Sequence, residues 1–234
     1  MTRVLFRWSV HVAVAFCSFA VGGAEEADRD FAPPKGLDEG WYARIETSFG
    51  RIVARLLPDQ APQSVAHFAR LAEGELAWFD PVVGEEKKAH YYDGIRVHLA
   101  EAGRRFEVGD RGTIGESTPR FYIPLEGSGP VNFSGSGRLG IVRSAGDRIN
   151  AVKFFVAVSP WPQLNGLHPC FGSIVSGREV AFQIAGVKTH RSDRPIEPVI
   201  IEKIRIFTVG DPPPLPEPEP YVPRLHKLAP APRR

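Results

Sequence analysis

The side chains best suited to form a binding site lie between Lys153 and Gly172. Phe154 and Phe155 open an apolar strand, and Leu164–His168 (Leu-Asn-Gly-Leu-His) follows about ten residues later. Aromatic and aliphatic side chains beside a histidine can form an apolar pocket that contains one hydrogen-bonding group. Taken alone, however, large aromatic residues at strand spacing are usually core, and a single histidine is more often structural than functional. Both readings stay open on these residues alone.

A second group of polar side chains comes earlier in the chain, where His98 is followed by Arg104, Arg105 and Glu107. Residues two apart on a β-strand point the same way, so Arg105 and Glu107 should share one face. Arginine only donates hydrogen bonds and an ionised glutamate only accepts them. Arg105 is therefore either part of a solvated rim or a donor that reaches into a groove, and Arg143 on a later strand has the same two options.

The elements that position these residues are mostly strands. Alternating apolar residues predict a hairpin over residues 43–57, Pro62 opens a helix that ends at Gly74, and Gly177–Ala185 predicts a second helix. Further strands are predicted at Ile95–His98, Phe106–Val108, Arg120–Ile123, Leu139–Arg143, Phe154–Val158, Phe171–Val175 and Pro198–Ile206. This content predicts a mostly β fold, a closed antiparallel barrel with helices at its ends.

Over this whole folded part the chain resembles the cyclophilin-type peptidyl-prolyl isomerases. The matching motifs, in the order of that family, are Ile45–Ile52, Leu56–Pro62, Val65–Phe68, Tyr92–Gly94, Gly109-Asp110, Phe154-Phe155, Leu164–His168 and Arg194–Val199. The resemblance implies a closed eight-stranded antiparallel barrel with two capping α-helices, which we expect to span residues 40–209. The segment Ala77–Lys88 is similar to an elaboration of exported bacterial members.

The resemblance also implies an activity, rotation about X-Pro peptide bonds. Amide resonance sets a barrier of roughly 18–20 kcal/mol, and no nucleophile is needed to cross it. An apolar pocket holds the proline ring while a fixed donor stabilises the twisted amide. In the family that donor is the arginine of a Phe-His-Arg motif, whereas this chain has Val97-His98-Leu99. Leu99 donates no hydrogen bond, so the resemblance predicts a degenerate active site.

The implied site residues divide into kept and altered positions. The expected substrate-binding residues are His98, Glu107, Val142, Phe155, Leu164 and His168. Arg104 and Arg105 replace apolar walls of the groove, Glu107 and Lys153 each replace a glutamine, and Gln163 stands where many members have tryptophan. No catalytic residue is assigned, with Arg105 and Arg143 as the candidate substitutes for the missing donor.

Two functions remain open at this point. The first is a peptidyl-prolyl isomerase with weak or altered activity. The second is a non-catalytic module that binds proline-containing or acidic peptides, which the basic residues Arg104, Arg105, Arg143 and Lys153 would favour. Either function implies proline-containing peptides or proteins as partners. The spacing of the histidines indicates no metal site, and no cofactor is expected.

The first 24 residues have the pattern of a signal peptide. Arg3 and Arg7 precede the apolar run Trp8–Val21, and small residues follow at 22–24. The bulky Phe16 argues against lipid attachment at Cys17. We therefore expect an exported protein, periplasmic or secreted by a bacterium, with no membrane span once the signal is removed. Cys170 would then be the single cysteine, with no internal disulfide.

The net charge of the mature chain and the composition of its two flanking segments give further predictions. Loss of Arg3 and Arg7 takes the 29 basic residues to 27, equal to the 27 acidic ones, so no nucleic-acid partner is expected. Residues 25–39 are predicted to be a lead-in linker. Residues 210–234 hold nine prolines and are predicted to be an extended, disordered tail, which can compete for the protein's own groove. We expect a monomer.

Overall fold

The computed structural model describes residues 31–80, 82–112, 122–126, 129–143 and 148–218. It divides the chain into two units, residues 1–36 and 37–234, and every described helix and strand belongs to the second. Within the first unit, residues 31–36 form neither helix nor strand and end in a turn at Lys35-Gly36. The predicted signal peptide and residues 219–234 of the predicted tail lie outside the described residues.

The second unit is built mainly of short strands. In chain order its elements are β1 (Gly40–Thr47), β2 (Gly50–Leu56), α2 (Pro62–Ala72), β3 (Ala77–Asp80), β4 (Glu85–Lys88), β5 (Ile95–Arg96), β6 (Leu99–Glu101), β7 (Arg105–Val108), β8 (Tyr122–Pro124), β9 (Arg138–Arg143), β10 (Arg148–Ala157), the 3-10 turn η1 (Pro162–Leu164), β11 (Cys170–Ser176), α3 (Arg178–Ala185) and β12 (Ile200–Val209). The predicted mostly β fold with two helices is confirmed.

All strands except the β3–β4 hairpin belong to one antiparallel sheet, in the order β5-β12-β1-β2-β11-β9-β10-β7-β6, with β8 paired to β10. The strands at its two ends, β5 and β6, are joined by Val97 and His98 alone. The amide of Val97 donates to the carbonyl of Val199 at 2.9 Å, and that of His98 to the carbonyl of Glu107 at 3.1 Å. One short segment therefore bonds to both ends of the curled sheet.

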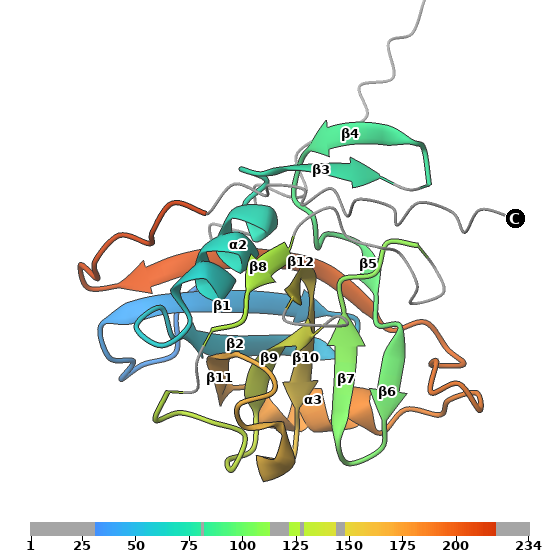
Figure 1. Ribbon diagram of the computed structural model, residues 1–234. Coiled ribbons are helices and arrows are strands. Elements are labelled where there is room, and N and C mark those ends of the chain that lie inside the picture. Colours follow the sequence, from blue (N-terminus) through green and yellow to red (C-terminus); the bar gives the residue numbers. More distant parts are fainter. Residues whose placement is uncertain (1–30, 81, 113–121, 127–128, 144–147, 219–234) are drawn as a thin grey trace, which may run out of the picture. The chain divides into compact units, whose positions relative to one another are not determined.

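Each helix begins at a residue that the sequence makes suitable. Pro62 occupies the first turn of α2, and the Glu126 carboxylate accepts hydrogen bonds from the amides of Gln63 and Ser64 at 2.6 and 2.8 Å. Gly177 precedes α3 with φ +83°, and a Cβ there would lie 2.2 Å from the carbonyl oxygen of Arg51. Only glycine fits this close approach. In Figure 1, α2 lies above β1 and β2, and α3 lies below them.

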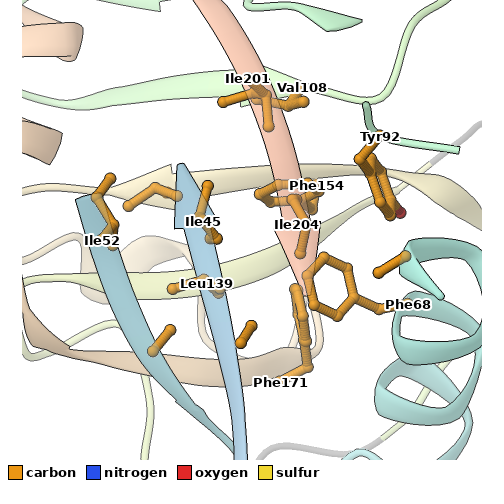
Figure 2. Packing of buried hydrophobic residues seen from close by; sticks show 14 of the residues in the cluster. Ile45, Ile52, Phe68, Tyr92, Val108, Leu139, Phe154, Phe171, Ile201 and Ile204 are labelled. Atoms are coloured by element: carbon orange, nitrogen blue, oxygen red, sulfur yellow. The ribbon is translucent and has the colours of Figure 1, made fainter. Parts of the chain in front are cut away.

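The main core fills the space between α2 and the inner face of the sheet. Phe68 of α2 packs against Phe154 and Phe171, as Figure 2 shows. The ring centroids lie 5.3 and 5.1 Å from that of Phe68. Ile45, Ile204 and the other labelled aliphatic side chains complete this layer, and all are buried. Their burial provides the hydrophobic stabilisation that holds α2 against the curled sheet.

Candidate functional site

A second, smaller apolar cluster lies on the other face of β10. Phe154 points into the main core, whereas Phe155, the next residue, belongs to the smaller cluster, because side chains alternate along a strand. Both phenyl rings are completely buried. The two phenylalanines therefore have different surroundings, and the choice between core and pocket floor applies to Phe155 alone.

Phe155 is the centre of this cluster, which we call the Phe155 cluster. Its ring stacks on Phe133 at 5.4 Å and meets the His168 ring edge-on at 5.3 Å. Ala157, Leu164 and Cys170 are buried with these rings, and Val131, Val142 and Trp161 pack against them. Gly140 lies underneath, where a Cβ would come within 2.3 Å of the Phe155 ring. The cluster thus unites Phe155, Leu164, His168 and Val142 of the predicted binding residues.

Charged side chains border the cluster on the adjoining strands. In the β6–β7 pair Leu99 lies opposite Glu107, and Glu101 lies opposite Arg105. In the β7–β10 pair Glu107 lies opposite Phe155. Directly opposed residues share a face of a sheet, so all five side chains project from the same face. Leu99, which replaces the arginine implied by the resemblance, is therefore beside both Glu107 and Arg105.

Arg105 extends over the Phe155 cluster. Its guanidinium carbon lies 5.7 Å from the centre of the Phe155 ring and 5.3 Å from that of Trp161. Its Nε donates to Glu101 at 3.1 Å, and its Nη1 lies 2.8 Å from Glu107 Oε1. Two carboxylates and two rings thus hold one guanidinium in a defined position, where it retains further N–H groups.

Glu107 is a buried carboxylate that stays ionised. Burial raises its pKa, but the hydrogen bond from His98 and the charges of Arg105 and Lys153 outweigh burial and leave the pKa of Glu107 below its ordinary value. His98 Nε2 lies 3.5 Å from Glu107 Oε2. The carboxylate therefore anchors Arg105 and His98 rather than serving as a proton donor.

We expect this carboxylate to make the protein's stability depend on acid pH. Its folded-state pKa lies below the value in the unfolded chain, about 4.3. Its stabilisation is therefore complete above that unfolded value and is lost as pH falls through the lower folded pKa. Urea unfolding of a Glu107→Gln variant between pH 6 and 3 should show a smaller loss of free energy of unfolding than the unchanged protein shows.

The exposed Glu85 provides the control for that experiment. A Glu85→Gln variant should lose stability with falling pH in parallel with the unchanged protein. Parallel curves for Glu107→Gln as well would mean that the buried ion pairs do not contribute.

His168 is present as the neutral imidazole. Burial lowers its pKa below the ordinary value, opposed in part by the hydrogen bond to Ile141. Its Nδ1 lies 3.0 Å from the Ile141 carbonyl oxygen and 3.3 Å from the Arg143 amide nitrogen, and the shorter contact, to an oxygen that can only accept, favours the proton on Nδ1. Nε2 is then the acceptor of the ring. His168 can accept a hydrogen bond from a ligand bound over Phe155.

The remaining predicted residues are placed less centrally. His98 reaches the cluster through Glu107 and lines a separate cavity with Asp110 and His190. Lys153 Nζ lies 3.6 Å from the buried Asp110. Gln163 is exposed on η1. These residues surround the Phe155 cluster without forming part of it.

Three further residues of the site, Phe133, Trp161 and Glu101, were not predicted from the sequence. Phe133 and Trp161 lie in loops, so no strand periodicity predicts their burial. The tryptophan in the turn before Leu164 could have been recognised as part of the apolar cluster from its position alone. Glu101 is paired with Arg105 because Gly103, with φ +69°, allows the turn between β6 and β7. Arg143, the other candidate donor, places its backbone amide 3.3 Å from His168 Nδ1.

Cys170 should be unreactive in the folded protein. It is 3% exposed in the cluster, and burial raises the pKa of its thiol to about 11. The reactive thiolate is therefore about one part in 10⁴ at pH 7. Ellman's reagent should modify Cys170 only when urea unfolds the protein, with the modified peptide identified by mass spectrometry. Fast modification without urea would show that β11 opens locally.

The geometry agrees with what comparison to known proteins finds. Residues 42–206 match the model of the cyclophilin type peptidyl-prolyl cis-trans isomerase family. The chain belongs to this family. Peptidyl-prolyl cis-trans isomerase B of Streptomyces anulatus is 35% identical over 175 residues, which cover 74% of this chain and 99% of that protein. A peptidyl-prolyl cis-trans isomerase of Schizosaccharomyces pombe is 31% identical over 162 residues, covering 68% and 94%.

Solved structures share the cyclophilin fold. A cyclophilin type isomerase of Cryptosporidium parvum, crystallised in the presence of the dipeptide Ala-Pro, superposes with a TM-score of 0.60 at 24% identity. The match covers 71% of this chain and 98% of that one. Among the described residues of our cyclophilin-type chain, no three metal-ligating side chains gather into a site, and no helix is long and apolar enough to span a membrane.

Proposed function

We propose that this chain is a peptidyl-prolyl cis-trans isomerase with altered catalysis, in which Arg105 replaces the arginine missing at Leu99. The observation that carries the proposal is the position of the Arg105 guanidinium, 5.7 Å above Phe155 and held by Glu101 and Glu107. Proline-containing peptides are the proposed substrates. The related isomerase of Cryptosporidium parvum, whose crystal structure was determined in the presence of Ala-Pro, supports that choice.

The proposed catalysis needs one free N–H beside an apolar seat. Twisting an X-Pro bond removes amide resonance and leaves a pyramidal nitrogen that can accept a hydrogen bond. Nε and Nη1 of Arg105 are engaged by the glutamates, and no described residue accepts a hydrogen bond from Nη2. With the proline ring over Phe155, Nη2 donates to the prolyl nitrogen. His168 Nε2 accepts an N–H of the bound peptide.

The same position of Arg105 favours a second candidate function, peptide binding without turnover. A guanidinium that covers Phe155 obstructs the proline ring, and the module then holds a peptide only at its rim. Selection of acidic peptides has less support, because Arg105 already pairs with two glutamates and Lys153 lies near Asp110. Paired charges attract a further carboxylate more weakly than unpaired ones do.

Exchange spectroscopy on short Ala-Pro and Glu-Pro peptides tests these alternatives. Accelerated cis-trans exchange supports the isomerase. Binding without acceleration supports the second candidate. If the peptides neither bind nor exchange faster, the groove does not function in peptide recognition. A Leu99→Arg variant sharpens the test, because a restored arginine should add little where Arg105 already donates. A gain of about 10² in rate would mean that the unchanged protein lacks a donor.

We also propose that the isomerase acts outside the cytoplasm of a bacterium, on the strength of the signal-peptide pattern in residues 1–24. Expression of the full gene followed by fractionation should recover a protein whose first residue is Glu25. A cytoplasmic product that keeps Arg3 and Arg7 would contradict this proposal.

A further inference from the structure

The described part of the proline-rich tail, residues 211–218, lies against β1 and α2. The indole Nε1 of Trp41 donates a hydrogen bond to the carbonyl of Pro213 at 2.9 Å. Figure 1 shows this red segment turning back from the end of β12 toward α2. Its contacts therefore involve other residues than the Phe155 cluster. The expected competition of the tail for the isomerase groove then rests on residues 219–234, which lie outside the described residues.

Three further contacts hold the same segment. Leu215 is partly buried against the main core. Glu217 Oε1 lies 2.7 Å from Arg70 Nη2 on α2, and the Glu217 carbonyl accepts a hydrogen bond from Gln63 Nε2 at 3.5 Å. The anchors are the backbone carbonyl of Pro213 and the side chains of Leu215 and Glu217, so every second residue of this stretch contacts the folded domain.

The chemistry of these anchors matches that of an extended proline-rich ligand. Prolines at 212–214, 216 and 218 fix φ and remove amide donors, which leaves carbonyl oxygens as the backbone groups to be recognised. An aromatic surface with an indole N–H is the usual receptor for such a chain. An arginine beyond it adds selectivity for a carboxylate. Trp41 binds the carbonyl of Pro213, the main core accommodates Leu215, and Arg70 pairs with Glu217.

A cavity adjoins the tail at its Trp41 end, and neither Arg70 nor Leu215 lines it. This cavity of about 690 Å³ lies between the prolines of the tail and the loop after β2, where Pro58, Asp59 and Gln60 form the opposite wall. A volume of that size is in the range of ligand pockets. A competing segment thus has room to make contact while the tail is still in place.

We propose that the surface from Trp41 on β1 to Arg70 on α2 is a binding site for extended proline-rich segments of the pattern Pro-x-Leu-x-Glu. Its resident ligand is the protein's own Pro213–Glu217. A proline-rich acidic segment of another protein binds there by displacing the tail. This recognition is independent of isomerisation, because it uses neither Arg105 nor Phe155.

The test weakens the resident ligand within the full chain. A Leu215→Ser, Glu217→Gln double variant loses two anchors, and both substitutions lie outside the sheet and helices. The probe is the synthetic peptide of residues 211–218, and the readout is the indole N–H resonance of Trp41, assigned with a Trp41→Phe variant. We expect the variant to shift this resonance and the peptide to restore it.

Competition provides the quantitative outcome. A tethered ligand acts at an effective concentration on the order of millimolar. The peptide should therefore bind the unchanged protein at least about tenfold more weakly than the double variant. A control peptide carrying the same serine and glutamine should leave the resonance unrestored.

Three results would overturn the proposal. The Trp41 resonance can be the same in the double variant and the unchanged protein, which would mean that these anchors do not hold the tail. It can stay unrestored at millimolar peptide. The peptide can instead shift the signals of Phe155 and His168, which would assign it to the isomerase groove. Isomerase activity, measured in parallel, has no bearing on any of the three.

Discussion

Replacing Arg105 by alanine should lower kcat/KM for Ala-Pro peptides by about 10² to 10³-fold, which is the usual cost of removing one preorganised donor. The expected loss follows from the position of the guanidinium above Phe155 and from the absence of a donor at Leu99. The measurement is cis-trans exchange of the peptide by NMR, under saturating and limiting substrate. An Arg105→Lys variant should recover little, because an ammonium lacks the planar fork that both glutamates grip.

Arg104 provides a matched control for this variant. It is exposed, and its guanidinium carbon lies 4.9 Å from the centre of the Trp161 ring without contact to Phe155. Arg104→Ala should therefore keep most of the activity while it removes the same charge. Faster exchange or tighter peptide binding in Arg105→Ala would contradict the proposed role and show that Arg105 obstructs the proline seat.

Replacing Phe155 by alanine should cost about 3–5 kcal/mol of the free energy of unfolding, as the removal of a fully buried phenylalanine ring does. The ring is 0% exposed and makes contacts with Phe133, His168 and Arg105 that no neighbour can replace. Urea unfolding measures the loss. Peptide binding should disappear together with the ring, because the floor of the proline seat is gone.

Two variants separate stability from binding in that experiment. Phe182 on α3 is 57% exposed, so Phe182→Ala should change the free energy of unfolding by no more than about 0.5 kcal/mol. Phe155→Leu keeps most of the buried volume and should remain folded while it binds proline peptides more weakly. Unchanged peptide affinity in Phe155→Leu would remove this ring from the proposed site.

Local patterns were sufficient for most of the sheet. The β1–β2 hairpin and both helices follow from alternation, from Pro62 and from Gly177. The predicted strand Ile95–His98 was only partly right: Ile95 and Arg96 pair with β12 as β5, and a separate strand, β6, begins at Leu99 and pairs with β7. That division depends on partners distant in sequence, so no local pattern contains it.

The β3–β4 hairpin shows what the sequence left out. Glu85–Lys88 is entirely charged, so it lacks the apolar alternation that announces a strand. The hairpin is held instead by side chains. Lys87 Nζ lies 2.7 Å from Asp80, and the Trp78 indole donates to the Ala89 carbonyl at 2.8 Å.

The candidate site was predicted in outline and not in detail. The resemblance selected Phe155 and His168, which the structure brings together, and strand alternation placed Arg105 on the face of Glu107. The second anchor of Arg105, Glu101, depends on a turn at Gly103 that could not be foreseen. The docking of Leu215 and Glu217 likewise depends on surfaces formed by the folded domain.

The pairing of β1 with β12 has a consequence for how this protein folds. Gly40 lies opposite Val209, so the first strand of the sheet obtains its second neighbour only when the last strand is present. Closing so long a loop costs chain entropy before any contact repays it. We expect folding to be slow, because contacts between residues distant in sequence dominate the sheet. During synthesis, β1 should lack a partner on one edge until the chain has passed residue 209, so the sheet should not be completed before then.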